Sequence, residues 1–158
     1  MAVVGESVYP RPTMNRAPHW AAPVCHPLPL GAALLMAAND HWLKGADLLP
    51  GALTGKLSDL CGLFFFPALL LTLWRGVLAL RGRPVHRSPV ATALAVGLTG
   101  ALFALANVSP GFNQWIAGWW GHKVMDPSDL AALVALAPAW LWLRRCDARS
   151  SRTLARPA

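Results

Sequence analysis

The sequence has few charged residues for its length. Only 13% of its 158 residues are charged, whereas 55% are hydrophobic. A soluble domain of this size has about 25% charged residues. The deficit indicates that lipid contacts much of the surface, and the length suits a single domain.

The motifs of several enzyme classes are also missing. The chain contains no glycine-rich phosphate loop, nucleophile elbow or HExxH sequence. Its three cysteines form no CxxC pair, and its histidines and acids show no metal-ligand spacing. We therefore expect free thiols, no metal and no cofactor.

The net charge of +7 does not indicate a nucleic-acid partner. The arginines fall in blocks beside apolar segments, and no basic stripe with stacking aromatic residues is present. Charge bias across a membrane explains this placement better. We expect the lipid bilayer, and no nucleic acid, as the partner.

Four apolar segments predict an all-α fold, an integral membrane four-helix bundle over residues 26–145. The third is twenty residues without a charge, the length needed to cross a bilayer. A leader with several prolines and arginines precedes the bundle at 1–25, and a basic tail follows at 146–158. The expected spans are about 27–43, 57–74, 89–108 and 127–143.

The charges around these spans predict the topology. Every arginine lies before the first span, between spans two and three, or after span four. All three lysines lie in the other two loops, beside five of the aspartates. The positive-inside rule then places both termini in the cytoplasm. Abundant Ala, Arg, Gly and Pro are typical of a GC-rich bacterial genome, so we expect a multi-pass protein of the bacterial inner (plasma) membrane.

The third span has small residues at four-residue spacing. They form two series: Ala93, Gly97 and Ala101, and Gly100 with Ala104. Small residues let lipid-solvated helices pack closely. We expect this helix near the centre of the bundle, and a homo-oligomer interface is the alternative.

The stretch TGKLSD opens the second span. Thr54 or Ser58 is expected to cap that helix, which places Asp59 in its first turn beside the positive end of the helix dipole. Lys56 is three residues before Asp59, close enough to pair with it on a helix.

The stretch DPSD repeats this pattern before the fourth span. Asp126 suits the N-cap, Pro127 suits the first helical position, and Asp129 follows in the first turn. Caps alone would explain these acids. Alternatively, the two stretches converge with the end of the first span, and Asn113 or His122, on an outward-facing polar pocket. Its candidate residues are Asp40, His41, Lys56, Ser58, Asp59, Asp126 and Asp129.

Three functions fit these features. The leading one is a protein without enzymatic activity that binds a lipid headgroup or an envelope metabolite in this pocket. The second is a small membrane enzyme that acts on a lipid-linked substrate through Asp59 with Asp126 or Asp129. The third is a structural or partner-binding subunit, which predicts separate acids and an exposed Gly97–Ala101 face.

The stretch from Asn39 to Pro67, followed by MDPSDLAAL, resembles small uncharacterised bacterial membrane proteins with a TGKLSD signature. It is also distantly similar to VanZ-like membrane proteins, which have a charged motif at the second span and an acidic motif before the last. That similarity would assign Lys56, Ser58 and Asp59 to the first motif and Asp126 and Asp129 to the second, and it implies a link to glycopeptide resistance. The usual Asp-Lys order followed by a histidine is absent here.

Overall fold

The computed structural model describes residues 20–46, 50–85, 88–120 and 125–154. Within these ranges all regular structure is helical, as predicted. Most of the predicted leader, residues 1–19, lies outside the described residues. The elements are α1 (Pro27–Ala38), the π-helical turn η1 (Asn39–Leu43), α2 (Gly51–Leu80), α3 (Pro89–Val108), α4 (Pro110–Trp120), the 3-10 helix η2 (Pro127–Ala135) and α5 (Leu136–Leu154).

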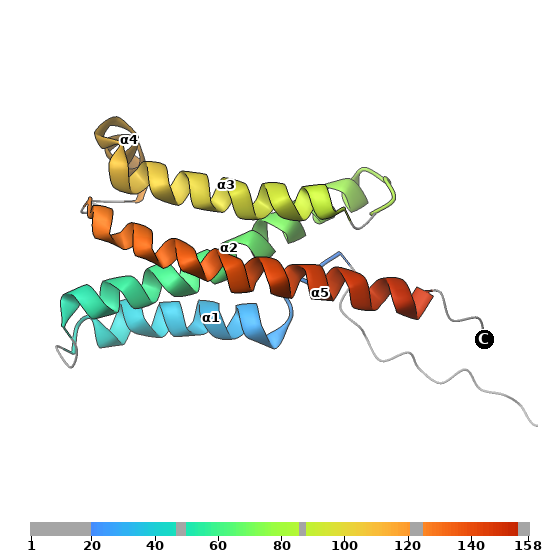
Figure 1. The fold of residues 1–158 in the computed structure, drawn as a ribbon, viewed down its shortest axis with the longest axis horizontal. Helices are drawn as coiled ribbons and strands as arrows, with labels where there is room; N and C mark the ends of the chain where they lie inside the picture. The colour runs from blue at the N-terminus through green and yellow to red at the C-terminus, as the bar shows by residue number, and fades with distance from the viewer. Residues whose placement is uncertain (1–19, 47–49, 86–87, 121–124, 155–158) are drawn as a thin grey trace, which may run out of the picture.

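Four rods run alongside one another, and successive rods reverse direction (Figure 1). They are α1 with η1, then α2, α3, and η2 with α5. The short helix α4 lies across one end. We call this end, with Lys44 and Lys56, the lysine end. The opposite end, where α2 and α5 carry their arginines, is the arginine end.

Helix α2 begins earlier than predicted. Its first residue is Gly51, its N-cap is Pro50, and its first turn contains no acid. The predicted caps at Thr54 and Ser58 are therefore wrong. The Thr54 hydroxyl instead donates to the carbonyl of Gly51 within the helix, at 3.0 Å. Asp59 lies in the third turn, too far from the helix end to interact with its dipole.

The central helix is α2, which corrects the expectation for the third span. Helix α2 packs against α1, α3, α5 and η2, whereas α3 has no contact with α1. One buried cluster joins α2, α3 and α5 through Ala68, Leu71, Ala95 and Leu143. A second joins α2 to η2, where Leu63 packs against two alanines. At 30 residues, α2 is long enough to reach all of these neighbours.

The small residues of α3 divide between two faces. Ala93, Gly97 and Ala101 are exposed, and a Cβ added at Gly97 would have no atom within 4 Å. Gly100 is half-buried, as is Ala104, and a Cβ at Gly100 would lie 2.7 Å from Leu136 Cδ1. Close packing within the chain therefore uses the Gly100 face and leaves the Gly97 face uncovered.

The fourth rod changes helix type along its length. It is a 3-10 helix from Pro127 to Ala135 and becomes α-helical at Leu136, two residues before Pro138. Proline cannot donate to the carbonyl four residues earlier, and its ring clashes with that carbonyl, so an α-helix is disfavoured just before it. The α-helix then continues to Leu154, beyond the predicted end of the span at 143.

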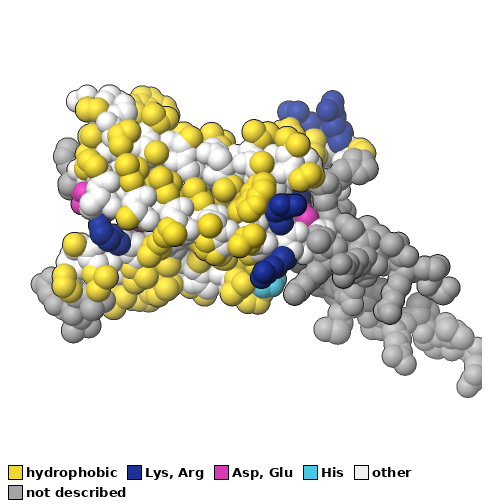
Figure 2. Space-filling model, in the orientation of Figure 1, with side chains coloured by type: hydrophobic (Ala, Val, Ile, Leu, Met, Phe, Trp, Pro, Cys, Tyr) yellow, Lys and Arg dark blue, Asp and Glu magenta, His cyan; other side chains and the backbone are white. Residues whose placement is uncertain are grey.

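Helices α2 and α3 are long and apolar enough to cross a membrane, each with a mean hydropathy of 1.9 over its most apolar window. Only 33% and 28% of these windows are buried by the rest of the chain. Figure 2 shows hydrophobic side chains over the middle of the rods and charged side chains at their ends. This distribution weakly supports a membrane location.

Candidate functional site

The TGKLSD and DPSD stretches meet at the lysine end. The Lys56 ammonium donates to the Ser128 hydroxyl at 2.9 Å and lies 3.4 Å from Asp129 Oδ1. The Lys56 side chain is 38% exposed and that of Asp129 is 18% exposed. Lys56 thus pairs across helices with an acid 73 residues away in the sequence.

A second set of contacts joins the end of the first rod to α2. Asn39 Nδ2 donates to the Thr54 carbonyl and to the Ser58 hydroxyl, both at 2.6 Å. Ser58 in turn donates to Asp40 Oδ1 at 2.6 Å, and Lys44 donates to the same oxygen at 2.6 Å. These bonds fix η1 against the first turns of α2.

Asp126 has the predicted role of N-cap. Its carboxylate accepts a hydrogen bond from the Ser128 backbone N–H at 2.8 Å, at the start of η2. This bond, with the Ser128 side chain and the charge of Lys56, holds the pKa of the Asp126 carboxyl below its usual range. Asp126 is fully exposed, so the cap explains this acid without a further function.

The remaining candidates lie around these contacts. His41 is exposed on η1, and Asp59 is half-buried on α2. The Asn113 side chain is directed away, because its Nδ2 donates to the Ala106 carbonyl at 2.7 Å and ties α4 to α3. His122 lies outside the described residues. The structure therefore places Lys56, Ser128 and Asp129 in one group and Asn39, Asp40 and Ser58 in another, joined through α2.

Within the described part of the chain, two buried amides carry an oxygen that has no hydrogen-bond partner. Asn39 and Asn107 are both 0% exposed, and Oδ1 of each accepts no hydrogen bond. An unsatisfied buried carbonyl costs about 1–3 kcal/mol. The Asn39 amide lies beside the Ser58–Asp40 contact, because its Nδ2 donates to the same Ser58 hydroxyl.

The arginine end contains a buried ion pair that the sequence did not reveal. Arg75 on α2 is only 4% exposed, and its Nη2 donates to Asp147 Oδ1 on α5 at 2.8 Å. The Thr92 hydroxyl on α3 donates to the other carboxylate oxygen at 3.1 Å. One carboxylate therefore joins three helices.

The sequence did contain a signal for this pair. Asp147 is the only acid among the arginines that flank spans two, three and four. Ionisable groups that face into a helical bundle usually pair with one another. A lone acid among many arginines is therefore a reasonable candidate for such a pair, although the pattern does not say which arginine it selects.

The described residues include no group of three or more His, Cys, Asp or Glu side chains that could hold a metal ion. In the described part of the chain, the cysteines at positions 25, 61 and 146 form no disulfide. Comparison with models of known protein families, with curated proteins and with solved structures finds no match.

Proposed function

We propose that this chain is a multi-pass protein of the bacterial inner membrane, without enzymatic activity, whose lysine end binds a lipid headgroup or an envelope metabolite at the outer leaflet. The four rods would be the four spans, with both termini in the cytoplasm. The main support is the contact of Lys56 with Ser128 and Asp129, which unites the two charged stretches on one surface.

The membrane part of the proposal is supported by the exposed apolar surface. Leu94 on α3 is 67% exposed, and Leu73 and Trp74 on α2 are 56% and 54% exposed. In water such a surface would be unstable or would bind another protein. In a bilayer the same surface is solvated by acyl chains.

Charge favours one kind of ligand. The described residues of the lysine end include two lysines and four aspartates, which are Lys44, Lys56, Asp40, Asp59, Asp126 and Asp129. Both lysines already contact acids. A ligand with amino or hydroxyl groups therefore suits this surface better than one with several phosphates, because carboxylates accept hydrogen bonds from such groups.

The test compares Lys56→Met with Lys44→Met, since both lysines are partly exposed at the same end but Lys44 pairs, among the described residues, with Asp40 on its own turn. The thermal stability of the purified full-length protein in detergent would be measured with and without phosphatidylethanolamine. We expect this lipid to stabilise the wild type and Lys44→Met more than Lys56→Met, because Lys56 holds Ser128 and Asp129 in place as acceptors for the ligand. Equal stabilisation of all three proteins would reject the lysine end as the binding site.

One observation favours a second function, that of a partner-binding membrane subunit. The Gly97–Ala101 face of α3 is uncovered in the single chain. Such faces let two helices approach closely in lipid. A Gly97→Ile variant would lose a partner or a second copy in cross-linking of native membranes, and unchanged cross-linking would reject this function.

A further inference from the structure

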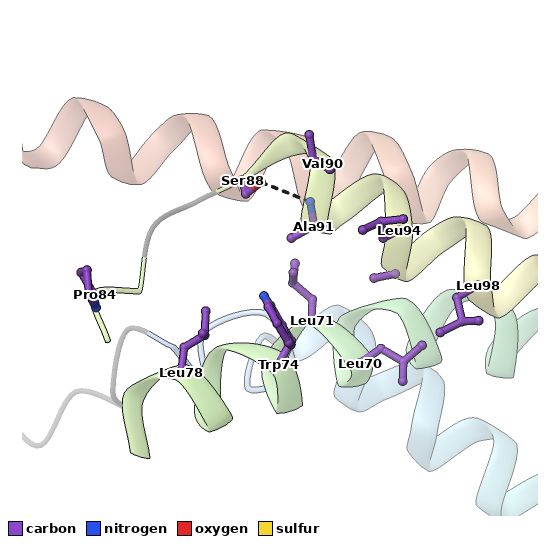
Figure 3. A pocket seen from close by; sticks show the side chains of 11 residues that line it. Leu70, Leu71, Trp74, Leu78, Pro84, Ser88, Val90, Ala91, Leu94 and Leu98 are labelled. Carbon is purple, nitrogen blue, oxygen red and sulfur yellow. Dashed lines mark hydrogen bonds between the residues drawn. The ribbon is translucent and has the colours of Figure 1, made fainter. Parts of the chain in front are cut away.

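A cavity of about 530 Å³ lies between α2 and α3, in the half of the molecule near the arginine end (Figure 3). It is separate from the polar contacts of the lysine end. Its size is within the range of about 300–1,000 Å³ that is usual for small-molecule sites. Its walls are mainly the side chains of Leu70, Trp74 and Leu78 on α2 and of Ala91, Leu94 and Leu98 on α3.

The cavity is an open groove with almost entirely apolar walls. Trp74, Leu94 and Leu98 line it and are 54%, 67% and 51% exposed. The helices therefore leave an apolar surface between them that the described part of the chain does not cover. Such walls suit a ligand with an apolar chain.

Two cations lie beside one end of the groove. Leu78 and Pro84 line that end, and the chain between them carries Arg81 and Arg83, both exposed. Among the described residues, neither arginine forms an ion pair. Both guanidinium groups are therefore available to an anion.

The backbone from Leu78 to Arg83 forms a defined turn. Gly82 adopts a φ of 63°, its N–H donates to Ala79, and the N–H of Arg83 donates to Leu78. This is a Schellman motif, which ends α2 and reverses the chain. It fixes the backbone at Arg81 and Arg83, which lie in the chain between Leu78 and Pro84, two residues that line the groove.

We propose that the groove between α2 and α3 binds one anionic phospholipid, with an acyl chain along the leucines and the phosphate on Arg81 and Arg83. Arginine suits this role, because its guanidinium binds phosphate through two parallel hydrogen bonds. Basic sites between membrane helices on the cytoplasmic side are suited to anionic headgroups. The inference relies on the membrane location proposed above but concerns the opposite leaflet from the lysine end.

The first experiment measures lipid retention by native mass spectrometry. The full-length protein would be purified from membranes and supplied with phosphatidylglycerol or with phosphatidylcholine. The double variant Arg81→Gln, Arg83→Gln would be compared with Arg144→Gln, Arg145→Gln, which removes two exposed arginines of α5 outside the groove. We expect a preference for phosphatidylglycerol that falls about ten- to thirtyfold in the first variant alone.

The second experiment places a bulky side chain in the groove. Ala91 lines the cavity, whereas Ala93 is exposed on α3 and does not line it. Ala91→Phe should displace the phospholipid, and Ala93→Phe should leave its retention unchanged. Equal retention by these two variants would place the lipid elsewhere and overturn the proposal.

The remaining outcomes are also decisive. Equal retention of the two lipids, or equal loss in both arginine variants, would show non-selective lipid contact and overturn the site. Extraction of native membranes with alkaline carbonate tests the underlying membrane location separately. Release of the wild-type chain by carbonate would reject the proposed function itself, whereas a chain that stays in the membrane without lipid preference would reject only the groove.

Discussion

The two ends of the molecule use charge in different ways. At the arginine end, Arg75 and Asp147 are 4% and 18% exposed, and Thr92 completes the contact from a third helix. At the lysine end, Lys56 is 38% exposed and lies 3.4 Å from Asp129. The first is a buried, short ion pair, and the second is longer and partly solvated.

This difference in exposure means that the two ion pairs contribute differently to the stability of the fold. A buried pair strongly destabilises a protein when one partner is removed, because the other charge is left without compensation. A partly exposed pair contributes little, since water solvates both groups when they separate. The pair at the arginine end therefore holds helices together, whereas the partly solvated pair at the lysine end can separate at little cost.

The largest expected effect comes from removing the buried acid. Asp147→Ala should lower the free energy of unfolding by about 3–5 kcal/mol, because Arg75 stays buried without a counter-charge. The matched change at the other end, Asp129→Ala, should cost about 0–1 kcal/mol. Denaturation of both variants in the same detergent measures the difference.

A double variant gives the control for this prediction. Arg75→Met with Asp147→Leu removes both charges and should recover most of the lost stability, since apolar replacements of a buried pair are often neutral. Similar stability of Asp147→Ala and Asp129→Ala would show that the two ends do not differ in the way described.

The second largest loss of stability is expected from removing the Thr92 hydroxyl, which completes the buried contact with Asp147. Thr92 is 0% exposed and donates to Asp147, so Thr92→Val should cost about 1.5–3 kcal/mol, the usual range for a hydrogen bond to a charged group. Ser128→Ala removes the corresponding hydroxyl of the lysine end. Because Ser128 is exposed, this change should cost less than about 0.5 kcal/mol. Equal losses in the two variants would contradict the comparison.

The smallest effect is the pH dependence of the Asp126 cap. Its pKa is held below the ordinary value of an aspartate by the hydrogen bonds from Ser128, so ionised Asp126 stabilises the fold above that ordinary pKa. The contribution should disappear as the pH falls through the lowered pKa of the folded state. Asp126→Asn keeps a cap but does not titrate. The melting temperature of the wild type relative to Asp126→Asn, measured from pH 7 to pH 3, should therefore decline only at the acidic end.

Local sequence signals predicted the positions of the helices better than they predicted how the helices pack against one another. Asp126 and Pro127 correctly marked the start of η2, because a cap is a local interaction. The start of α2 was misplaced, since Pro50 initiates it without a side-chain cap. Helix α4 was not predicted at all, because its eleven residues, including two glycines, are too few for a span.

Contacts between distant residues were harder to predict. Convergence of the TGKLSD and DPSD stretches was only one of two interpretations, and the sequence paired Lys56 with Asp59 and did not single out Asp129, which Lys56 contacts in the structure. The pairing of Arg75 with Asp147 depends on how α2 and α5 rotate about their axes, which apolar helices hardly encode. For the same reason the spacing of Gly97 and Gly100 did not show which of them faces a neighbour.

The 3-10 geometry of η2 increases the length of the fourth rod along its axis. Nine residues cover about 18 Å as a 3-10 helix, at about 2.0 Å per residue, but only about 13.5 Å as an α-helix. The fourth apolar segment is short for a bilayer about 30 Å thick. On the proposed topology, the stretched start of this rod lengthens it by almost one α-helical turn. This segment has few apolar residues, and as an α-helix it would have to stand closer to the bilayer normal than its neighbours. The extra length lets it span the membrane at the same tilt as they do.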